Sequence, residues 1–411
     1  MTVSVALWAD ELGLGDRIEA LRGRVTVVRR TDELAEIAAL AESGLADAAL
    51  LAGPASEVEA PLVDALTGLG ATVVVLVDDD GERARLAGLG AHCLPVEADE
   101  HAVTELLEQE AGRGPGPVAA AGHRPGDRDG ARAERPKGRI VAVWGPTGSP
   151  GRTTVAVNFA VESAQAGRSV LLVDADTYGA SAGVHLGLLD ESAGAAQLCR
   201  LADQGVLDAA GFERACPVVA VAGTRLRIAT GLPRAQRWPE LRAAALGRVL
   251  DFARRQVDLV VVDTSAYLEL DEDLSFDTAA PQRNGAALAV LEAADEVVAV
   301  GQADSVGVPR LIKALEALQE VLPTVRPNIV FNKVKGAALG RKPERQLRET
   351  WERFGPGLPI TGWLPWDPDA VDAALLAGSA LAESFPDSRL RAAIAGLAGH
   401  GVQRRVGAFR R

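Results

Sequence analysis

The sequence predicts an α/β protein made of two doubly wound, parallel-sheet domains. Three observations predict this fold class. Short apolar runs alternate with helical patterns along the 411 residues, a segment rich in glycine, proline and charge divides them into two series, and the second series contains a glycine-rich loop. We place the first domain at residues 1–110, a flexible linker at 111–138, the second domain at 139–400 and a basic tail at 401–411.

Five apolar runs in the first domain predict the strands of a parallel sheet. They are VSVALWA, VTVVRR, DAALLAG, ATVVVLVD and AHCLPV. Parallel strands need crossover connections, and the helical patterns between these runs supply them.

This first domain resembles the receiver domain of response regulators in architecture. A receiver accepts its phosphate on an aspartate at the end of the third strand, where this chain reads ALLAGP, and the lysine expected after the fifth strand is replaced by Leu94. Asp10 and Glu11 follow the first strand as a receiver's acidic pair would, but without an acceptor we interpret them as solvated carboxylates. We therefore predict a pseudo-receiver that docks partners and is not phosphorylated.

The linker contains one large aliphatic residue, Val118, among many glycines, prolines and charged residues. Such a segment buries too little apolar surface to offset the entropy lost on ordering. We expect a flexible connection.

Charge is distributed unevenly along the chain. Residues 1–110 carry 7 arginines and no lysine against 22 acidic residues, a balance of −15, whereas the remainder has 36 basic against 34 acidic residues. An acidic first domain and a near-neutral second domain disfavour nucleic acid as a partner. The N-terminus lacks the basic region of a signal peptide, and no run approaches the ~20 apolar residues of a membrane span. We expect a cytoplasmic protein without a transmembrane segment.

Seven apolar runs in the second domain predict buried strands of one large sheet with helices between them. They are RIVAVWG, SVLLVDAD, LRIATG, DLVVVDT, EVVAVG, NIVFNKV and PITGWLP.

The segment VAVWGPTGSPGRTTVAVNFA predicts a phosphate-binding loop between a strand and a helix. Backbone N–H groups in such a loop and the dipole of the following helix attract phosphate oxygens. The candidate nucleotide-binding residues of the loop are Gly148, Gly151, Arg152, Thr153 and Thr154. The alternative is a tight strand-to-helix turn that binds no ligand.

Three aspartates close apolar runs near this loop. Asp174 and Asp176 end SVLLVDAD, and Asp263 ends the run of DLVVVDT. A lone aspartate at a strand end is often only a helix cap, but three beside a phosphate loop indicate a Mg²⁺ site made by Thr153, Asp174 and Asp263.

These motifs, in this order and spacing, resemble the MinD/ParA group of deviant-Walker ATPases over residues 139–395. The stretches that carry the resemblance are GPTGSPGRTTVAVNFA, LLVDADTYGAS, LVVVDTSA, AADEVVAVGQAD, VFNKV and GWLPWDPDAVDAALLAGSAL. With a receiver-like domain in front, the chain is most similar to the CpaE/TadZ branch, which serves Flp pilus assembly and whose relatives are labelled septum-site-determining proteins.

The resemblance implies ATP and Mg²⁺ as cofactors, a homodimer, and protein partners from a pilus-assembly or division machinery. It also implies recruitment to the inner face of the cell membrane or to a cell pole. By the same resemblance Asn332 contacts adenine, Asp176 positions the hydrolytic water, and Asp263 holds Mg²⁺ through water. Asp176 and Arg152 are the candidate catalytic residues.

Departures from the family pattern predict weakened chemistry. The signature lysine of the group falls at Thr147, Arg152 replaces the Walker lysine, and Pro150 lacks an N–H. Each lost charge-assisted hydrogen bond costs roughly 1.5–3 kcal/mol, although a bidentate contact from Arg152 would recover part of this. We expect weak to moderate binding of ATP or ADP, with hydrolysis that is slow or absent.

For three other features we adopt an interpretation without a binding function. We interpret the acidic run after Asp263 as a solvated loop in preference to a partner surface, and the basic tail as a frayed end in preference to a peripheral membrane contact. Trp363 and Trp366 we assign to the core.

Three hypotheses about function remain open. The first is an ATP-binding positioning factor, which Asp174, Asp176, Asp263 and Asn332 favour. The second is a scaffold that has lost nucleotide chemistry, which Thr147, Pro150 and Arg152 favour. The third is a partition ATPase acting on DNA, which the charge balance opposes.

Overall fold

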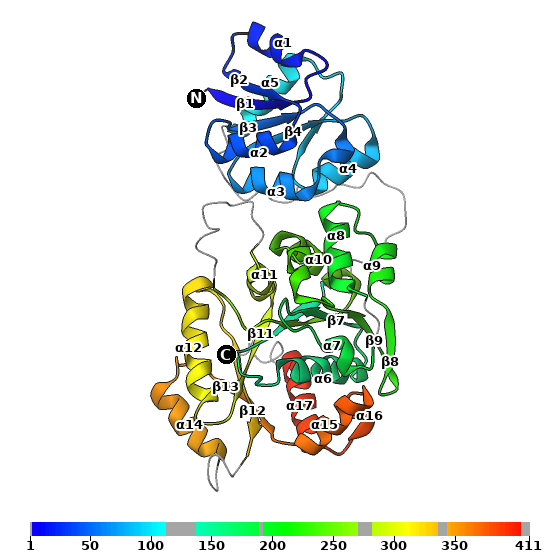
Figure 1. Ribbon diagram of the computed structural model, residues 1–411, viewed down its shortest axis with the longest axis vertical. Helices are drawn as coiled ribbons and strands as arrows, with labels where there is room; N and C mark the ends of the chain where they lie inside the picture. Colours follow the sequence, from blue (N-terminus) through cyan, green and yellow to red (C-terminus); the bar gives the residue numbers. More distant parts are fainter. Residues whose placement is uncertain (1, 112–136, 189–191, 270–281, 336–342, 404–411) are drawn as a thin grey trace, which may run out of the picture. The chain divides into compact units, whose positions relative to one another are not determined.

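The computed structural model describes residues 2–111, 137–188, 192–269, 282–335 and 343–403. These residues form two compact units, one mainly from the N-terminal part of the chain and one mainly from residue 137 onward, each with its own sheet (Figure 1). Most of the predicted linker, the acidic run and the basic tail lie outside the described residues. Within the described ranges, no helix is long and apolar enough to cross a membrane.

The first unit is built on a five-stranded parallel sheet with strand order β2-β1-β3-β4-β5. The strands are β1 Val3–Trp8, β2 Val25–Thr31, β3 Ala48–Leu51, β4 Thr72–Leu76 and β5 His92–Leu94. The helices are α1 Leu14–Ala20, α2 Leu34–Glu42, α3 Ala60–Gly68, α4 Asp80–Gly88 and α5 Glu100–Ala111. All five strands coincide with the predicted apolar runs.

Alternate side chains of this sheet enter two separate cores. Trp8 and Leu51 pack with residues of α2, α3 and α4 on one face, while Leu7 and Leu50 pack with residues of α1 and α5 on the other. Helices on both faces explain why the strands read as continuous apolar runs.

Asp10 corrects one prediction. Its carboxylate accepts hydrogen bonds from the N–H groups of Leu14, at 2.7 Å, and Gly15, at 3.0 Å, and its side chain is only 8% exposed beside Arg30. The interpretation of Asp10 as a solvated group was therefore wrong, because the unpaired N–H groups that open α1 need an acceptor. Glu11 is exposed, as predicted.

The second unit contains an eight-stranded sheet with strand order β13-β12-β11-β6-β10-β7-β9-β8. The strands are β6 Arg139–Trp144, β7 Val170–Ala175, β8 Val218–Val221, β9 Thr224–Ala229, β10 Leu259–Thr264, β11 Glu296–Gln302, β12 Asn328–Val334 and β13 Ile360–Pro365. Seven coincide with the predicted runs, and β8 was missed.

Strand β8 makes the sheet mixed, because it pairs antiparallel with β9 at the edge. Ala222 and Gly223 connect the two strands, with φ of 49° and 73°. Two successive positive φ angles are typical of a type I′ hairpin turn. The VVAV run of β8 is as apolar as the predicted runs, but it is only four residues long and largely exposed, as an edge strand can be.

Helices cover both faces of this sheet. They are α6 Arg152–Gln165, α7 Ala182–His185, α8 Gly194–Asp203, α9 Ala209–Ala215, α10 Ala243–Gln256, α11 Gly285–Ala293, α12 Gly307–Val321, α14 Pro343–Phe354, α15 Pro368–Ala377, α16 Leu381–Ser384 and α17 Arg389–Gln403.

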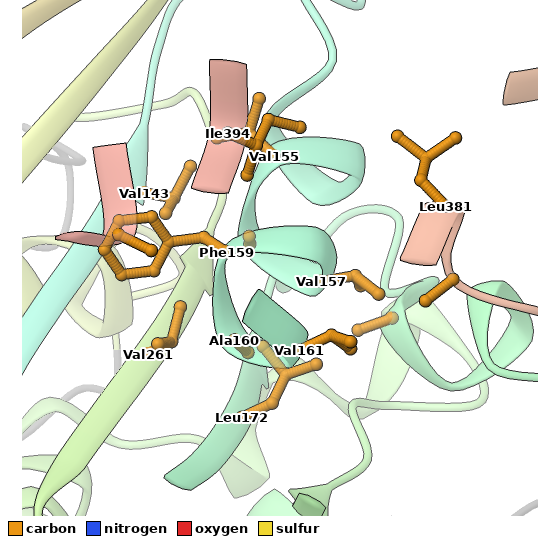
Figure 2. Close-up of a cluster of buried hydrophobic side chains, with 14 of the residues drawn as sticks. Val143, Val155, Val157, Phe159, Ala160, Val161, Leu172, Val261, Leu381 and Ile394 are labelled. Atoms are coloured by element: carbon orange, nitrogen blue, oxygen red, sulfur yellow. The ribbon is translucent and has the colours of Figure 1, made fainter. Parts of the chain in front are cut away.

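Helix α6 lies in the centre of the main core of the second unit. Figure 2 shows its Val155 and Phe159 among Val143 of β6, Val261 of β10 and Ile394 of α17, all of them buried. Burial of this kind stabilises the packing by about 25 cal/mol per Å² of apolar surface. It fixes the N-terminus of α6 at the edge where the parallel strands end.

Candidate functional site

The ends of three central strands meet beside the loop that joins β6 to α6. Strand β10 lies between β6 and β7, and Asp263 is paired in register with Val143 on one side and with Asp174 on the other. The structure therefore brings together the glycine-rich loop and the aspartates that the sequence singled out.

Three residues of the loop have positive φ: Gly148 at 100°, Ser149 at 55° and Gly151 at 94°. A Cβ atom at Gly151 would lie 2.5 Å from Nδ2 of Asn332, so only glycine fits there. No side chain caps the N-terminus of α6, which begins at Arg152. Its first N–H groups are available to an anion.

Gly148 lines a cavity of about 270 Å³. The exposed Thr147 and Arg310 of α12 also line this cavity. A Cβ atom at Gly148 would lie 2.4 Å from Nη1 of Arg310, so the guanidinium of Arg310 lies directly against the loop.

The guanidinium of Arg152 folds back onto its own loop. Its Nη1 donates to the carbonyl oxygens of Gly145, at 3.2 Å, and Pro146, at 2.9 Å, and its Nε donates to that of Thr264 at 3.2 Å. Its Nη2 lies 3.6 Å from Oδ2 of Asp176, and both side chains are largely buried. Arg152 thus links the loop, the end of β10 and Asp176.

Asp174 and Asp176 bind backbone groups that follow β7. Oδ2 of Asp174 accepts hydrogen bonds from the N–H groups of Ser181, at 2.8 Å, and Ala182, at 2.9 Å, at the start of α7. Burial raises the pKa of Asp174 to about 6, although these hydrogen bonds oppose the rise. Oδ1 of Asp176 accepts from the N–H groups of Tyr178, at 2.9 Å, and Gly179, at 3.1 Å. Both aspartates organise the turn.

Asp263 differs from both. It is 1% exposed, and no hydrogen bond of good geometry reaches either carboxylate oxygen among the described residues, although the Thr153 hydroxyl lies close enough to interact with it. Burial raises its pKa well above the usual value and the charge of Asp174 adds to this, while the nearby Thr153 hydroxyl and Arg152 partly offset it. Unpaired buried polar atoms are rare in folded proteins, and a bound ion is one of their ordinary explanations.

The donor set around Asp263 fits Mg²⁺ better than a metal that needs a protein cage. No group of three or more His, Cys, Asp or Glu side chains in the described part of the chain is arranged to hold a metal. Magnesium is commonly bound by one or two carboxylates, with water and substrate phosphates completing its shell. A half-buried Thr153 hydroxyl beside Asp263 suits that arrangement.

Asn332 lies two residues before the end of β12, against the loop. Its Nδ2 donates to the carbonyl oxygen of Pro150 at 2.8 Å, and its Oδ1 accepts from the N–H of Lys333. Thr154 lies half-buried in the first turn of α6, where its carbonyl oxygen accepts from Nδ2 of Asn158.

Sequence reasoning missed Lys333. It has a φ of 58°, and its Nζ donates to the carbonyl oxygen of Ser149 at 2.8 Å. The same ammonium lies 5.4 Å from the ring centroid of Trp366. Trp366 is 41% exposed, so its assignment to the core was wrong: it directly follows the end of β13, and although its N–H still donates to the carbonyl oxygen of Val334, its side chain is open to solvent. The adjacent Asn332 in VFNKV was the available signal for Lys333.

Comparison with known proteins places the second unit in a family. The family model for the CobQ/CobB/MinD/ParA nucleotide binding domain matches residues 141–376. The chain is also 28% identical over 255 residues to the antiactivator FleN of Pseudomonas aeruginosa, covering 61% of this chain and 81% of FleN.

Two solved structures share the fold. A ParA family ATPase from Chlorobium tepidum superposes with a TM-score of 0.53 at 21% identity, over 64% of this chain and 99% of its own. The septum-site-determining protein MinD from Pyrococcus horikoshii, complexed with Mg-ADP, gives 0.50 at 19% identity, over 65% of this chain and 97% of its own.

Proposed function

We infer that this chain, which belongs to the CobQ/CobB/MinD/ParA nucleotide-binding domain family, is an ATP-binding positioning factor with slow ATPase activity. The observation that carries this proposal is the buried carboxyl of Asp263, which lacks a well-formed hydrogen bond among the described residues and lies beside the Thr153 hydroxyl of the glycine-rich loop. An unpaired buried carboxyl costs free energy, which binding of a cation beside a polyphosphate would recover.

The proposed roles follow from the family resemblance, taken together with the positions of the residues. The opening N–H groups of α6, with Gly148 and Gly151, bind phosphate oxygens, and Asn332 contacts the base. Thr153, Asp174 and Asp263 hold Mg²⁺, which when bound neutralises charge on the phosphates. Asp176 orients the attacking water.

Arg152 explains why we propose slow hydrolysis. Its guanidinium already binds loop carbonyls and pairs with Asp176. To reach a phosphate it must give up some of these contacts, and Asp176 must lose its countercharge. Both changes raise the free energy of the productive state relative to the resting one.

The finer proposal concerns the biological role. The first unit has the strand order of receiver-like folds and carries Ala52 and Gly53, without an aspartate, after β3. We propose that it is a pseudo-receiver that docks proteins, that the chain acts as a homodimer in the CpaE/TadZ branch, and that its partners belong to a pilus-assembly or division machinery. The relative FleN is named for acting on an activator, which supports action through a protein partner.

A specific observation favours a second candidate, a nucleotide-independent scaffold. In the scaffold reading, the contacts of Arg152 with Gly145, Pro146, Thr264 and Asp176 close the loop permanently.

Titration with a fluorescent ATP analogue, with and without Mg²⁺, distinguishes the two. We expect saturable, Mg²⁺-dependent binding that Arg152→Ala weakens by about 10- to 100-fold, equivalent to the loss of one charge-assisted hydrogen bond. Arg345→Ala is the matched control, because Arg345 is an exposed arginine of α14 paired only to Glu349 in the described structure. Absence of saturable binding at millimolar nucleotide would leave the scaffold.

A further inference from the structure

The chain contains two tyrosines, and they lie against one another. Tyr178 belongs to the turn after β7 and Tyr267 to the segment after β10, with ring centroids 4.4 Å apart and planes inclined by 39°. The guanidinium carbon of Arg283 lies 3.7 Å from the ring centroid of Tyr178. Aromatic pairs and cation–π contacts of this geometry attract one another beyond what the buried apolar area alone provides.

Hydrogen bonds tie the same three segments together. The hydroxyl of Tyr178 donates to Oδ1 of Asn284 at 2.9 Å, and Nδ2 of Asn284 donates to the carbonyl oxygen of Glu269 at 2.7 Å. Nη2 of Arg283 donates to the carbonyl oxygen of Thr177 at 3.0 Å. The turn after β7, the segment after β10 and the residues before α11 therefore form one clamp, defined here by Tyr178, Tyr267 and Arg283.

The clamp continues into the phosphate loop through Asp176. One oxygen of Asp176 accepts the N–H groups of Tyr178 and Gly179, and the other lies 3.6 Å from Nη2 of Arg152. Because Asp176 and Tyr178 share one short turn, a shift of the turn moves both. A ligand that draws Arg152 away from Asp176 removes one of the two restraints on that carboxylate.

We propose that Tyr178, Tyr267 and Arg283 are positioning residues for Asp176: the clamp fixes this carboxylate beside Arg152 and moves when the loop binds a nucleoside polyphosphate. This inference rests on the proposed function. The tyrosines lie only 36% and 38% exposed, so a movement of the turn changes their surroundings. Arg283 is half-buried, and its Nε has no partner within the described residues, which leaves the aromatic face and Thr177 as its anchors.

Fluorine NMR of the full chain labelled with fluorotyrosine tests the proposal directly, since every label falls in the clamp. Tyr267→Phe assigns the two resonances. We expect both resonances to shift when Mg²⁺ and ADP saturate the protein. Arg283→Gln removes the guanidinium, so the resonance of Tyr178 moves in the free protein and its nucleotide-dependent shift is lost, while Arg283→Lys restores part of it.

Asp176→Asn separates coupling from folding. The amide oxygen of asparagine still accepts the N–H groups of Tyr178 and Gly179, but the charge that attracts Arg152 is gone. We expect the free spectrum to stay near that of the unmodified chain and the nucleotide-dependent shift to disappear. Tyr178→Phe keeps the ring, gives a second variant should Arg283→Gln fail to fold, and should retain the shift of the Tyr267 resonance.

Binding of the fluorescent analogue, measured in parallel, separates two failures. If the analogue binds to the unmodified chain but both tyrosine resonances stay fixed on addition of Mg²⁺ and ADP, the clamp is overturned and the proposed function is left intact. No analogue binding in the unmodified chain would overturn both. Shifts that survive in Asp176→Asn would also overturn the clamp, because the route through Asp176 would be unnecessary.

Discussion

Under the proposed function, the buried carboxyl group of Asp263 lowers the stability of the protein when no cation is bound. It is buried, lacks a well-formed hydrogen bond within the described ranges, and has a pKa raised mainly by burial. We expect Asp263→Asn to raise the free energy of unfolding by about 1 kcal/mol in Mg²⁺-free buffer, because a neutral amide is cheaper to bury than a carboxylate. The same change should abolish Mg²⁺-dependent binding of the ATP analogue.

Chemical denaturation measures the first effect and the analogue titration measures the second. Asp258→Asn is a control just before the start of the same strand, where the carboxylate accepts two hydrogen bonds from Ser169. This control should be no more stable than the unmodified chain. If Asp263→Asn destabilises the protein to the same degree, the carboxyl of Asp263 is structural.

His185 provides a test of acid sensitivity. Burial lowers its pKa from 6.5 to about 4. Because the unfolded chain then binds more protons than the folded one between these values, the stability contributed by His185 is present above pH 6.5 and is lost as the pH falls toward 4. The difference in unfolding free energy between the unmodified chain and His185→Gln should be about 2 kcal/mol smaller at pH 5 than at pH 7.

His101→Gln replaces an exposed imidazole and serves as the control for the loss of a histidine. A His185→Gln difference that does not depend on pH would contradict the prediction. Other groups, including Asp174, also titrate in this range, so only the difference between variants isolates His185.

For single residues, the sequence predicts which residue types stand at the ends of the strands, but it does not predict which of those residues contact one another. An apolar run that ends in aspartate is local information, so Asp174 and Asp263 could be found. The pair of Arg152 with Asp176 and the bond from Lys333 to the loop depend on how the strands are ordered and how the side chains turn. These contacts join segments far apart in the chain, which spacing alone does not encode.

At the scale of the elements, the hairpin of β8 and β9 contains a strained backbone conformation that a substitution can relieve. Ala222 has a φ of 49°, a left-handed conformation that costs an alanine about 1–2 kcal/mol. Asparagine tolerates this conformation, and Asn-Gly is the preferred type I′ pair. We expect Ala222→Asn to raise the free energy of unfolding by about 0.5–1 kcal/mol, measured by chemical denaturation.

Ala220→Asn places the same side chain inside β8 and should lower the free energy of unfolding, because asparagine is disfavoured in strands. Equal effects of the two changes would mean that the turn conformation does not matter. The same Ala-Gly pair explains why β8 was missed. The hairpin turns at Ala222 and Gly223, and alanine is not a residue type that predicts a turn. The buried strands were predictable because helices on both faces require long apolar runs.

For the molecule as a whole, the fold class and the break in composition were readable from sequence, whereas the order of strands in each sheet was not. Alternation of strand and helix dictates a layered fold. Which strands are neighbours depends on the path of each crossover, and the eight-stranded order β13-β12-β11-β6-β10-β7-β9-β8 has no counterpart in linear spacing. The domain boundaries that composition suggests can be tested by cutting the chain.

The first unit has a core on each face of its own sheet, so we expect the fragment 1–111 to fold by itself. Its residues 1–110 carry a balance of −15, and like charges on a compact unit repel one another. The melting temperature of this fragment should therefore rise as the salt concentration is raised from about 0.01 to 1 M, because the screening length falls from about 30 to 3 Å. The fragment 112–411, with nearly balanced charge, should respond less. Thermal unfolding followed by circular dichroism measures both, and an unfolded 1–111 fragment would show that the N-terminal sheet is not an independent domain.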